Sequence, residues 1–352
     1  MADQEEPVFR KQPRRQFLIG YAILAFVFLV LPFLTPYKGL MVDIVIWTLF
    51  ATGFNLAFGF TGMVSLAHGV FFGVSAYTAG MLSIFWTRSV VTIPIGIMMG
   101  TLTGFIVGYV SLKRARIDVH KALQIAYLVL ISIAASRVAL YLFLSPLGKY
   151  SGAEMGLLGF PNEPLRIAGD LKLDTTQPLQ TYLIIGMVAL IMIAWLHRMA
   201  SSPAGIIMKA VRENEMRVSF LGYNTFRFKL LIYVISAFVA SVAGCLYLFR
   251  SGFISADPFD FTFTSELVVI CVLGGRNVFF GPFIGTVIFL TLKDLISSYT
   301  VSWGLVLAVV LIVSVLYLPK GLAAPFFSLA DPWMKRMRKK IPLHETASSQ
   351  PD

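Results

Sequence analysis

The 352-residue chain is too apolar to fold as a set of soluble domains. Hydrophobic residues make up 57% of it and charged residues 13%, whereas soluble domains average about 45–50% and about 25%. The net charge of +11 does not indicate nucleic-acid binding, because Lys and Arg cluster in short segments between apolar runs. We therefore expect an all-α polytopic membrane protein. Its two cysteines, Cys245 and Cys271, lie inside apolar runs and are expected to pack there.

Apolar runs long enough to cross a bilayer, about 20 residues each, follow one another along the chain. We expect full spans at Phe17–Thr35, Leu40–Phe58, Met63–Phe85, Val90–Leu112, Ala122–Leu144, Thr181–Leu196, Leu230–Phe249 and Val301–Leu318. A longer run over 261–292 is broken at Gly274-Gly275-Arg276-Asn277 and is expected to form two short helices or a re-entrant segment. The expectation is about ten transmembrane helices, of which eight are full spans. The first run is too long for a signal peptide and is expected to be retained.

The basic segments predict the orientation of the chain. Lys and Arg concentrate in the tail 1–16, in the loops 113–121 and 197–229, and in the tail 319–352. The loop 145–180 instead carries four acidic residues against three basic ones. Because basic loops remain on the cytoplasmic side, we expect both tails and the 197–229 loop in the cytoplasm. The 145–180 loop is expected in the periplasm, and 17–318 forms the membrane domain.

Small residues recur every three or four positions in the span expected at Met63–Phe85. On a helix they would form one stripe against which a neighbour packs: Gly62, Ser65, Gly69, Gly73, Ala76 and Gly80. Gly281 and Gly285 repeat this pattern. Polar atoms at the start of the same span, and the free backbone groups of a Gly-Gly break, are costly unless they face a cavity or a partner. The residues concerned serve either packing alone or also a polar path: Thr61, Ser65, His68, Gly274 and Gly275.

The 197–229 loop predicts a single capped amphipathic helix. Ser202 suits the cap, Pro203 the first turn and Gly222 the end of such a helix. Glu213 and Arg217 are spaced for an ion pair on it. The helix either lies on the inner leaflet or docks a cytoplasmic partner. Docking is favoured because the sequence contains no G-x-x-x-x-G-K-[ST] loop with which to bind ATP itself.

Taken together, these segments resemble the permease family of bacterial ATP-binding-cassette importers for branched-chain amino acids, specifically its M-type membrane subunit. The resemblance covers about residues 40–322 and is carried by Gly59–Gly62, Ser65–Gly69, Phe72–Ala79, Ala210–Glu215, Leu221–Asn224, Phe228–Leu230, Ser236–Tyr247, Val272–Gly285 and Leu318–Leu322. The chain departs from the family pattern over 113–135 and 150–156. The second of these regions would lie near the substrate entrance, so the substrate stays open.

The resemblance implies a type II importer fold in the bacterial inner membrane and a division of labour among subunits. A second permease subunit, two cytoplasmic ATP-binding subunits and a periplasmic substrate-binding protein would complete the importer. ATP would be bound by the partner subunits, and this chain would hold no cofactor or metal and no catalytic residue. The resemblance implies ATPase coupling at Gly205, Arg212, Glu213, Glu215 and Gly222, and a translocation path at Thr61, Ser65, His68, Gly274 and Gly275.

Several alternatives remain at this stage. The expected substrates are branched-chain or related hydrophobic amino acids, with urea, short amides and aromatic or carboxylic acids as alternatives. A proton- or sodium-coupled carrier would need an ionisable group deep in a span, and the candidates Asp43, Arg137 and Glu266 have no evident partner in the sequence. An intramembrane enzyme would need an acidic residue beside Ser65 and His68, and none accompanies them there.

Overall fold

The computed structural model describes residues 28, 38–85, 91–115, 121–157, 165–168, 171–173, 178–276 and 278–299, with a few isolated positions between 304 and 322. Six of its helices are long and apolar enough to cross a membrane: α3 (Lys38–Asn55), α4 (His68–Phe85), α5 (Thr92–Ala115), α6 (Lys121–Leu144), α8 (Pro178–Ala200) and α11 (Thr225–Ser251). The spans expected at 17–35 and 301–318 lie almost wholly outside the described residues. The total of about ten therefore stays a prediction.

Shorter elements connect the long helices. In chain order they are the π-helix Leu56–Phe60, α7 (Gly148–Ser151), the 3-10 helix Ala153–Met155, β1 (Leu165–Ala168), β2 (Leu171–Leu173), α9 (Pro203–Glu213), α10 (Glu215–Phe220), the 3-10 helix Asp257–Phe259, α12 (Phe261–Gly274) and α13 (Gly281–Ser297). A short antiparallel hairpin of β1 and β2 lies within the 145–180 loop, outside the apolar spans, so the membrane spans themselves are helical as expected. Most of the apolar runs are helical, because a helix satisfies its own backbone in lipid.

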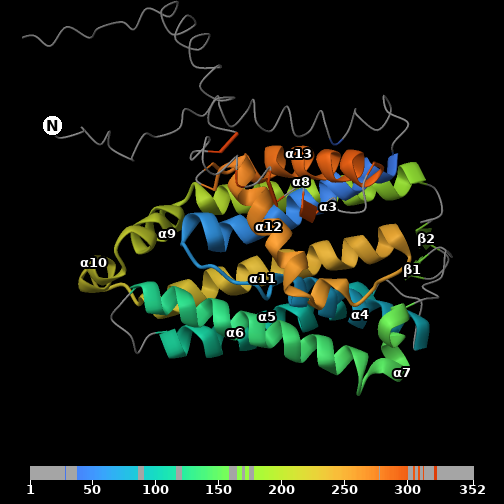
Figure 1. Ribbon diagram of the computed structural model, residues 1–352, viewed down its shortest axis with the longest axis horizontal. Coiled ribbons are helices and arrows are strands. Elements are labelled where there is room, and N and C mark those ends of the chain that lie inside the picture. The colour runs from blue at the N-terminus through green and yellow to red at the C-terminus, as the bar shows by residue number, and fades with distance from the viewer. Residues whose placement is uncertain are drawn as a thin grey trace, which may run out of the picture.

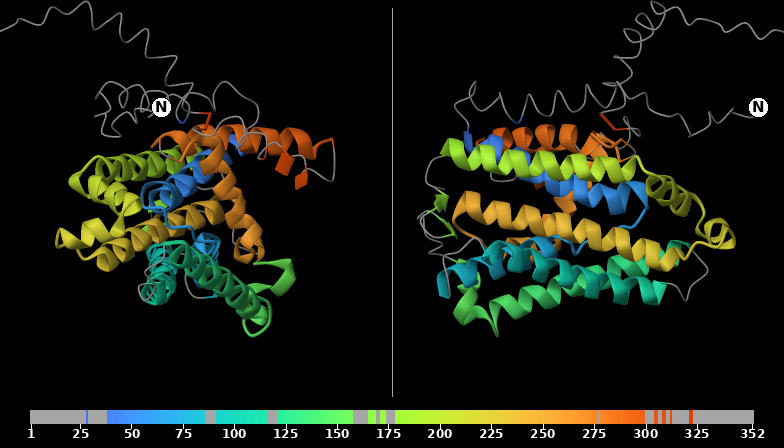
Figure 2. Two further views of the ribbon diagram at one scale, coloured as in Figure 1. Left: turned by 60° about the vertical axis from the view of Figure 1, so that its left-hand side comes forward. Right: turned by 180° about the vertical axis from the view of Figure 1, so that it is seen from behind.

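The long helices form two groups with α11 between them. On one side lie α3, α8 and α13, and on the other α4, α5 and α6, as Figures 1 and 2 show. Helices α9 and α10 project at one end of the bundle, whereas α7 and the β-hairpin lie at the opposite end. An isolated bridge between Leu157 and Ile254 joins two loops at the α7 end. The loops expected on opposite sides of the membrane thus lie at opposite ends of the bundle.

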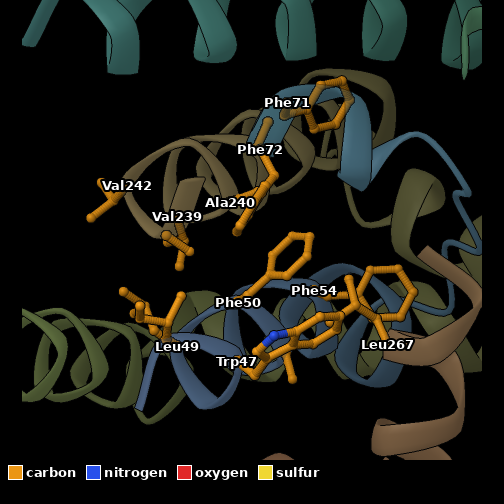
Figure 3. Close-up of a cluster of buried hydrophobic side chains, with 14 of the residues drawn as sticks. Trp47, Leu49, Phe50, Phe54, Phe71, Phe72, Val239, Ala240, Val242 and Leu267 are labelled. Carbon is orange, nitrogen blue, oxygen red and sulfur yellow. The ribbon is translucent and has the colours of Figure 1, made fainter. Parts of the chain in front are cut away.

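Aromatic side chains fill the space where α3 faces α4 and α11. Figure 3 shows Phe50 of α3 directed toward Phe72 of α4, whereas Phe54 lies on the side of Leu267 of α12. The ring centroids of Phe50 and Phe72 lie 5.0 Å apart, within the range of favourable aromatic pairs. All of these side chains are buried. The space between these helices is therefore a packed aromatic core.

Helix α5 packs through a row of glycines that the sequence analysis overlooked. Gly96, Gly100, Gly104 and Gly108 follow at intervals of four, so they lie along one helix face. A Cβ atom on Gly104 would overlap the side chain of Ala237, and one on Gly108 would come within 2.5 Å of the Tyr233 ring. The absence of side chains lets α5 approach α4 and α11 closely, which is how helices associate in lipid.

The break predicted within 261–292 is present. Helix α12 ends at Gly274, Gly275 adopts a φ of +102°, and α13 begins at Gly281. A Cβ on Gly274 would overlap the Gly281 carbonyl, and one on Gly285 the Ile270 carbonyl. The glycines are required for close contact between the two short helices.

Charged residues within the spans are paired between helices. Asp43 of α3 binds Arg250 of α11 at 2.9 Å, and Glu266 of α12 binds Lys293 of α13 at 2.8 Å. Arg137 of α6 lies 3.4 Å from Asp260. All three ionisable candidates thus have partners that the sequence did not reveal. Cys245 and Cys271 are buried and unbridged, which confirms the packing expectation.

Candidate functional site

The chain between α3 and α4 is not helical where a span was expected. The prediction that the helix begins at Met63 is wrong, because α4 begins only at His68. Residues Thr61–Ala67, called here the broken segment, form neither helix nor strand, and Gly62 has a φ of +75°. That conformation suits glycine and interrupts a helix. Gly62 and Ser65 therefore do not belong to the small-residue stripe on α4.

Serine and threonine side chains satisfy the backbone around the broken segment. The Leu66 amide donates to Ser132 Oγ at 2.9 Å, and the Leu66 carbonyl accepts from Ser136 Oγ at 3.0 Å. The Gly69 amide donates to Thr264 Oγ1 at 2.9 Å. Irregular backbone at membrane depth persists only where protein or a water-filled cavity surrounds it. Here helices α6 and α12 surround the irregular backbone and provide its hydrogen-bond partners.

The polar side chains of the broken segment, and that of His68 just after it, point into the helix bundle. Ser65 Oγ and Tyr233 OH are hydrogen-bonded at 2.7 Å, and His68 Nε2 and Ser236 Oγ at 2.8 Å. Ser236 in turn donates to the Gly53 carbonyl at 2.7 Å. These buried bonds fix the segment between α3 and α11 and leave His68 Nδ1 without a partner among the described residues. Thr61 is also buried and donates to the Ala57 carbonyl at 2.6 Å.

The opposite edge of the broken segment is accessible. Gly62, Val64 and Leu66 are half-buried, whereas Met63, Ser65 and Ala67 are fully buried. Alternate residues of the segment therefore face the protein interior and the more accessible side. The outward edge is apolar, and the inward edge carries the polar group that bonds to Tyr233.

The rest of the predicted stripe does lie on α4 and faces protein. A Cβ on Gly69 would overlap the Pro258 carbonyl, and one on Gly73 would lie 2.9 Å from the Phe259 ring. A Cβ on Gly80 would lie 2.5 Å from Leu157. Ala76 is fully buried. This face of α4 seats the 3-10 helix Asp257–Phe259 and the segment around Leu157.

The second break approaches the π-helix that precedes the broken segment at Gly59. A Cβ on Gly59 would overlap both the Arg276 carbonyl and the Asn55 amide group. Gly275, which Gly321 contacts closely, directly precedes Arg276. The expected path residues thus fall into two adjoining sets, one at the broken segment and one at the Gly274–Gly275 break. The glycines of the second set pack against backbone rather than line an open space.

The expected single helix at 203–222 is in fact two helices. Asn214 is extended (φ −153°, ψ 102°), and its side chain caps α10 by accepting from the Arg217 amide at 3.0 Å. Asn is among the strongest capping residues, so the chain starts a new helix there. The kink removes the i,i+4 geometry expected for Glu213 and Arg217. Ser202 occupies the N-cap position of α9 and Pro203 its first turn, as expected, but the Ser202 hydroxyl donates to the Met199 carbonyl and makes no capping bond.

The expected coupling residues point in different directions. Arg212 Nη1 donates to the Gly59 carbonyl at 2.6 Å, and Glu215 forms an ion pair with Lys229. Glu213 is exposed. Gly205 lies so close to the Ala200 carbonyl that a Cβ would overlap it, and Gly222 ends α10 with a φ of +88°. Among the described residues, no three His, Cys, Asp or Glu side chains gather as metal ligands.

The fold and the site define the class of the protein. A bundle of apolar helices with two adjoining non-helical breaks is typical of polytopic membrane transporters. Residues 37–316 match the family described as "Branched-chain amino acid transport system / permease component". The chain belongs to this family, whose members are transport proteins and not enzymes.

Individual relatives agree with this family. The chain is 26% identical to the high-affinity branched-chain amino acid transport system permease protein LivM of Escherichia coli, over 88% of this chain and 75% of the relative. It is 25% identical to LivM of Salmonella typhimurium, over 79% and 67%. Similarity extends to the probable permease protein LivH of Methanocaldococcus jannaschii, at 23% over 82% and 90%. No solved structure matches the chain.

Several site residues escaped sequence reasoning. Ser132 and Ser136 of α6 and Tyr233 and Ser236 of α11 all bond to the broken segment or to His68. The available signal was polar residues at helical spacing inside otherwise apolar spans. A single sequence does not show which distant segment such residues contact.

Proposed function

We propose that this chain is the membrane-spanning permease subunit of an ATP-binding-cassette importer for branched-chain or related hydrophobic amino acids. The observation that carries the proposal is the family match over 37–316, joined to a non-helical segment that packs inside the bundle between two candidate spans. A second permease subunit, two cytoplasmic ATP-binding subunits and a periplasmic binding protein would complete the importer in the bacterial inner membrane. Urea, short amides and aromatic or carboxylic acids are the alternative substrates.

The accessible edge of the broken segment is the best candidate for the path. Gly62, Val64 and Leu66 lie along this edge and offer an apolar surface to a hydrophobic substrate. Thr61, Ser65 and His68, first expected to line the path, have the role of holding the segment in place through their buried hydrogen bonds. Gly274 and Gly275 have the same supporting role at the second break.

The surface of the loop between α8 and α11 supports ATPase docking. Met216 is 55% exposed, Phe220 81% and Leu221 76%, all on or next to the short helix α10 at the tip of the bundle (Figure 1). Exposed apolar side chains beside charged ones are typical of an interaction surface. We assign the docking surface to Glu213, Met216, Phe220 and Leu221, within the segment Gly205–Gly222.

Substrate uptake by the assembled importer tests the function directly. The chain is co-expressed with a candidate second permease subunit, ATP-binding subunits and binding protein from the same organism, and uptake is measured in intact cells and in proteoliposomes. We expect ATP-dependent accumulation of leucine, isoleucine or valine. Accumulation of urea, acetamide or benzoate in place of these amino acids would select an alternative substrate, and ATP-independent, proton-driven uptake would contradict the proposal.

Cysteine labelling checks the orientation. The variants Glu154→Cys and Glu213→Cys place exposed thiols at opposite ends of the bundle, and the native cysteines are buried. A membrane-impermeant maleimide applied to spheroplasts is expected to label position 154 and to reach position 213 only after permeabilisation. The reverse pattern would invert the topology.

Docking is checked by changing the apolar tip. The double variant Phe220→Asp/Leu221→Asp is expected to reduce co-purification of the ATP-binding subunits about tenfold, because two exposed anchors of an interface are lost. Met155→Asp serves as the control, since Met155 is 78% exposed at the α7 end. Full recovery of the ATP-binding subunits with the double variant would remove α10 from the docking surface.

A further inference from the structure

Two basic residues of α9 contact the π-helix that precedes the broken segment. Arg212 Nη1 donates to the Gly59 carbonyl at 2.6 Å, and Lys209 Nζ lies 5.6 Å from the centroid of the Phe60 ring. The two residues are three positions apart on α9, so they project from the same face. We call these two contacts the basic clamp. The clamped residues directly precede Thr61, where the broken segment begins.

The clamp fits the chemistry of a helix end. The last carbonyls of a helix have no partner within it, and basic side chains bind them favourably. Gly59 is the fourth of the five residues of the π-helix Leu56–Phe60, so its carbonyl is such a group. The guanidinium of Arg212 supplies a charge-assisted donor to it.

Gly62, which has no side chain, leaves room for the side chain of Arg212. The position that a Cβ on Gly62 would occupy lies 3.2 Å from Arg212 Cγ. The stem of Arg212 therefore passes over the first glycine of the broken segment on its way to Gly59. Burial and the neighbouring positive charge of Arg276 both lower the pKa of Arg212. The guanidinium thus lies where α9, the π-helix and the second break converge.

We propose that Arg212 is a positioning residue that transmits movement of α9 to the broken segment, and that it is not itself a contact of the ATPase. The inference rests on the proposed function. A displacement of α9 carries the clamped residues Gly59 and Phe60 with it, and these are covalently continuous with Thr61–Ala67. Losing the clamp therefore separates ATP hydrolysis from transport while α10 remains free to dock.

The test replaces Arg212 in the assembled importer. Arg212→Met keeps the aliphatic stem and removes the donors, and Arg212→Lys keeps one charged donor. Arg227→Met is a control for charge loss at an exposed position in the first turn of α11. We expect Arg212→Met to retain the ATP-binding subunits and ATP hydrolysis but to lower uptake about tenfold, the loss expected for a charge-assisted hydrogen bond. Arg212→Lys is expected to restore part of the uptake, and Arg227→Met to leave it unchanged.

The outcomes separate the inference from the proposed function. Undiminished uptake by Arg212→Met would overturn the inference alone, and loss of the ATP-binding subunits from that variant would return Arg212 to the docking surface. A wild-type complex without ATP-dependent uptake would overturn the proposed function and the inference with it.

A cross-link gives a second measurement that does not depend on the Arg212 variants. Lys209→Cys and Phe60→Cys are introduced together and joined with a short bifunctional thiol reagent in the assembled importer. If α9 and the π-helix move as one body, the cross-linked protein retains uptake. A cross-link that abolishes uptake, or thiols that cannot be joined, would contradict the clamp.

Discussion

Replacing Gly104 by alanine is expected to destabilise the protein, although alanine is ordinarily the better helix former by about 0.5–1 kcal/mol. The added Cβ would overlap the side chain of Ala237 on α11, and overfilling a packed core costs about 1–3 kcal/mol. Gly104→Leu adds three more carbons and is expected to prevent α5 from packing, with loss of folded protein. The measurements are the thermal midpoint and the yield of monodisperse protein in detergent.

Gly186 of α8 provides a matched control for that substitution. A Cβ there would meet only the Phe28 carbonyl, at 3.7 Å, which is ordinary van der Waals contact. Gly186→Ala is therefore expected to leave the thermal midpoint unchanged or to raise it. If Gly104→Ala were as stable as Gly186→Ala, the glycine row of α5 would not be a packing surface.

Much of the fold could be predicted because lipid imposes simple rules on a sequence. Six apolar runs became helices near their expected bounds, since a helix is the way for one segment to satisfy its backbone in hydrocarbon. The break at Gly274–Gly275 was also predicted, because consecutive glycines weaken a helix. In both cases the information is local to the segment.

The misplaced start of α4 shows where local reasoning failed. Counting small residues at helical spacing joined Gly62 and Ser65 to the stripe, but spacing does not show that Gly62 needs a positive φ. The kink at Asn214 was missed for a related reason: Asn followed by Glu215 is a helix start inside what was interpreted as one helix. Each error came from extending one pattern across a residue that favours a break.

The contacts of the site were beyond prediction for a different reason. Ser65 and Tyr233 are 168 residues apart, and Arg212 and Gly59 are 153 apart. Polar residues in apolar spans indicate that a partner exists, but which helix provides it depends on how the bundle packs. The ion pairs of Asp43 and Glu266 are further examples, since both partners lie on other helices.

Removing the hydroxyls of the two serines that bond to Leu66 is expected to lower both the stability of the protein and its uptake activity. Ser132 accepts from the Leu66 amide and Ser136 donates to the Leu66 carbonyl. In the double variant Ser132→Ala/Ser136→Ala both backbone groups lose these partners, and each unsatisfied buried group costs about 1–3 kcal/mol. We expect a lower thermal midpoint, and uptake reduced more than about tenfold because the broken segment is no longer held in one conformation.

Two further variants show whether an effect comes from losing the hydrogen bonds to the broken segment or simply from losing a buried hydroxyl group. Ser111→Ala removes a buried serine of α5 whose hydroxyl donates to the Val107 carbonyl of its own helix at 2.7 Å, and it is expected to leave uptake unchanged. Ser132→Thr/Ser136→Thr keeps both hydroxyls and is expected to restore uptake at least partly. The Leu66 amide and carbonyl bond to the two serines of α6 and not to a helix of their own. If the double alanine variant kept wild-type stability and uptake, these bonds would not hold the broken segment, and its conformation would differ from the one in this structure.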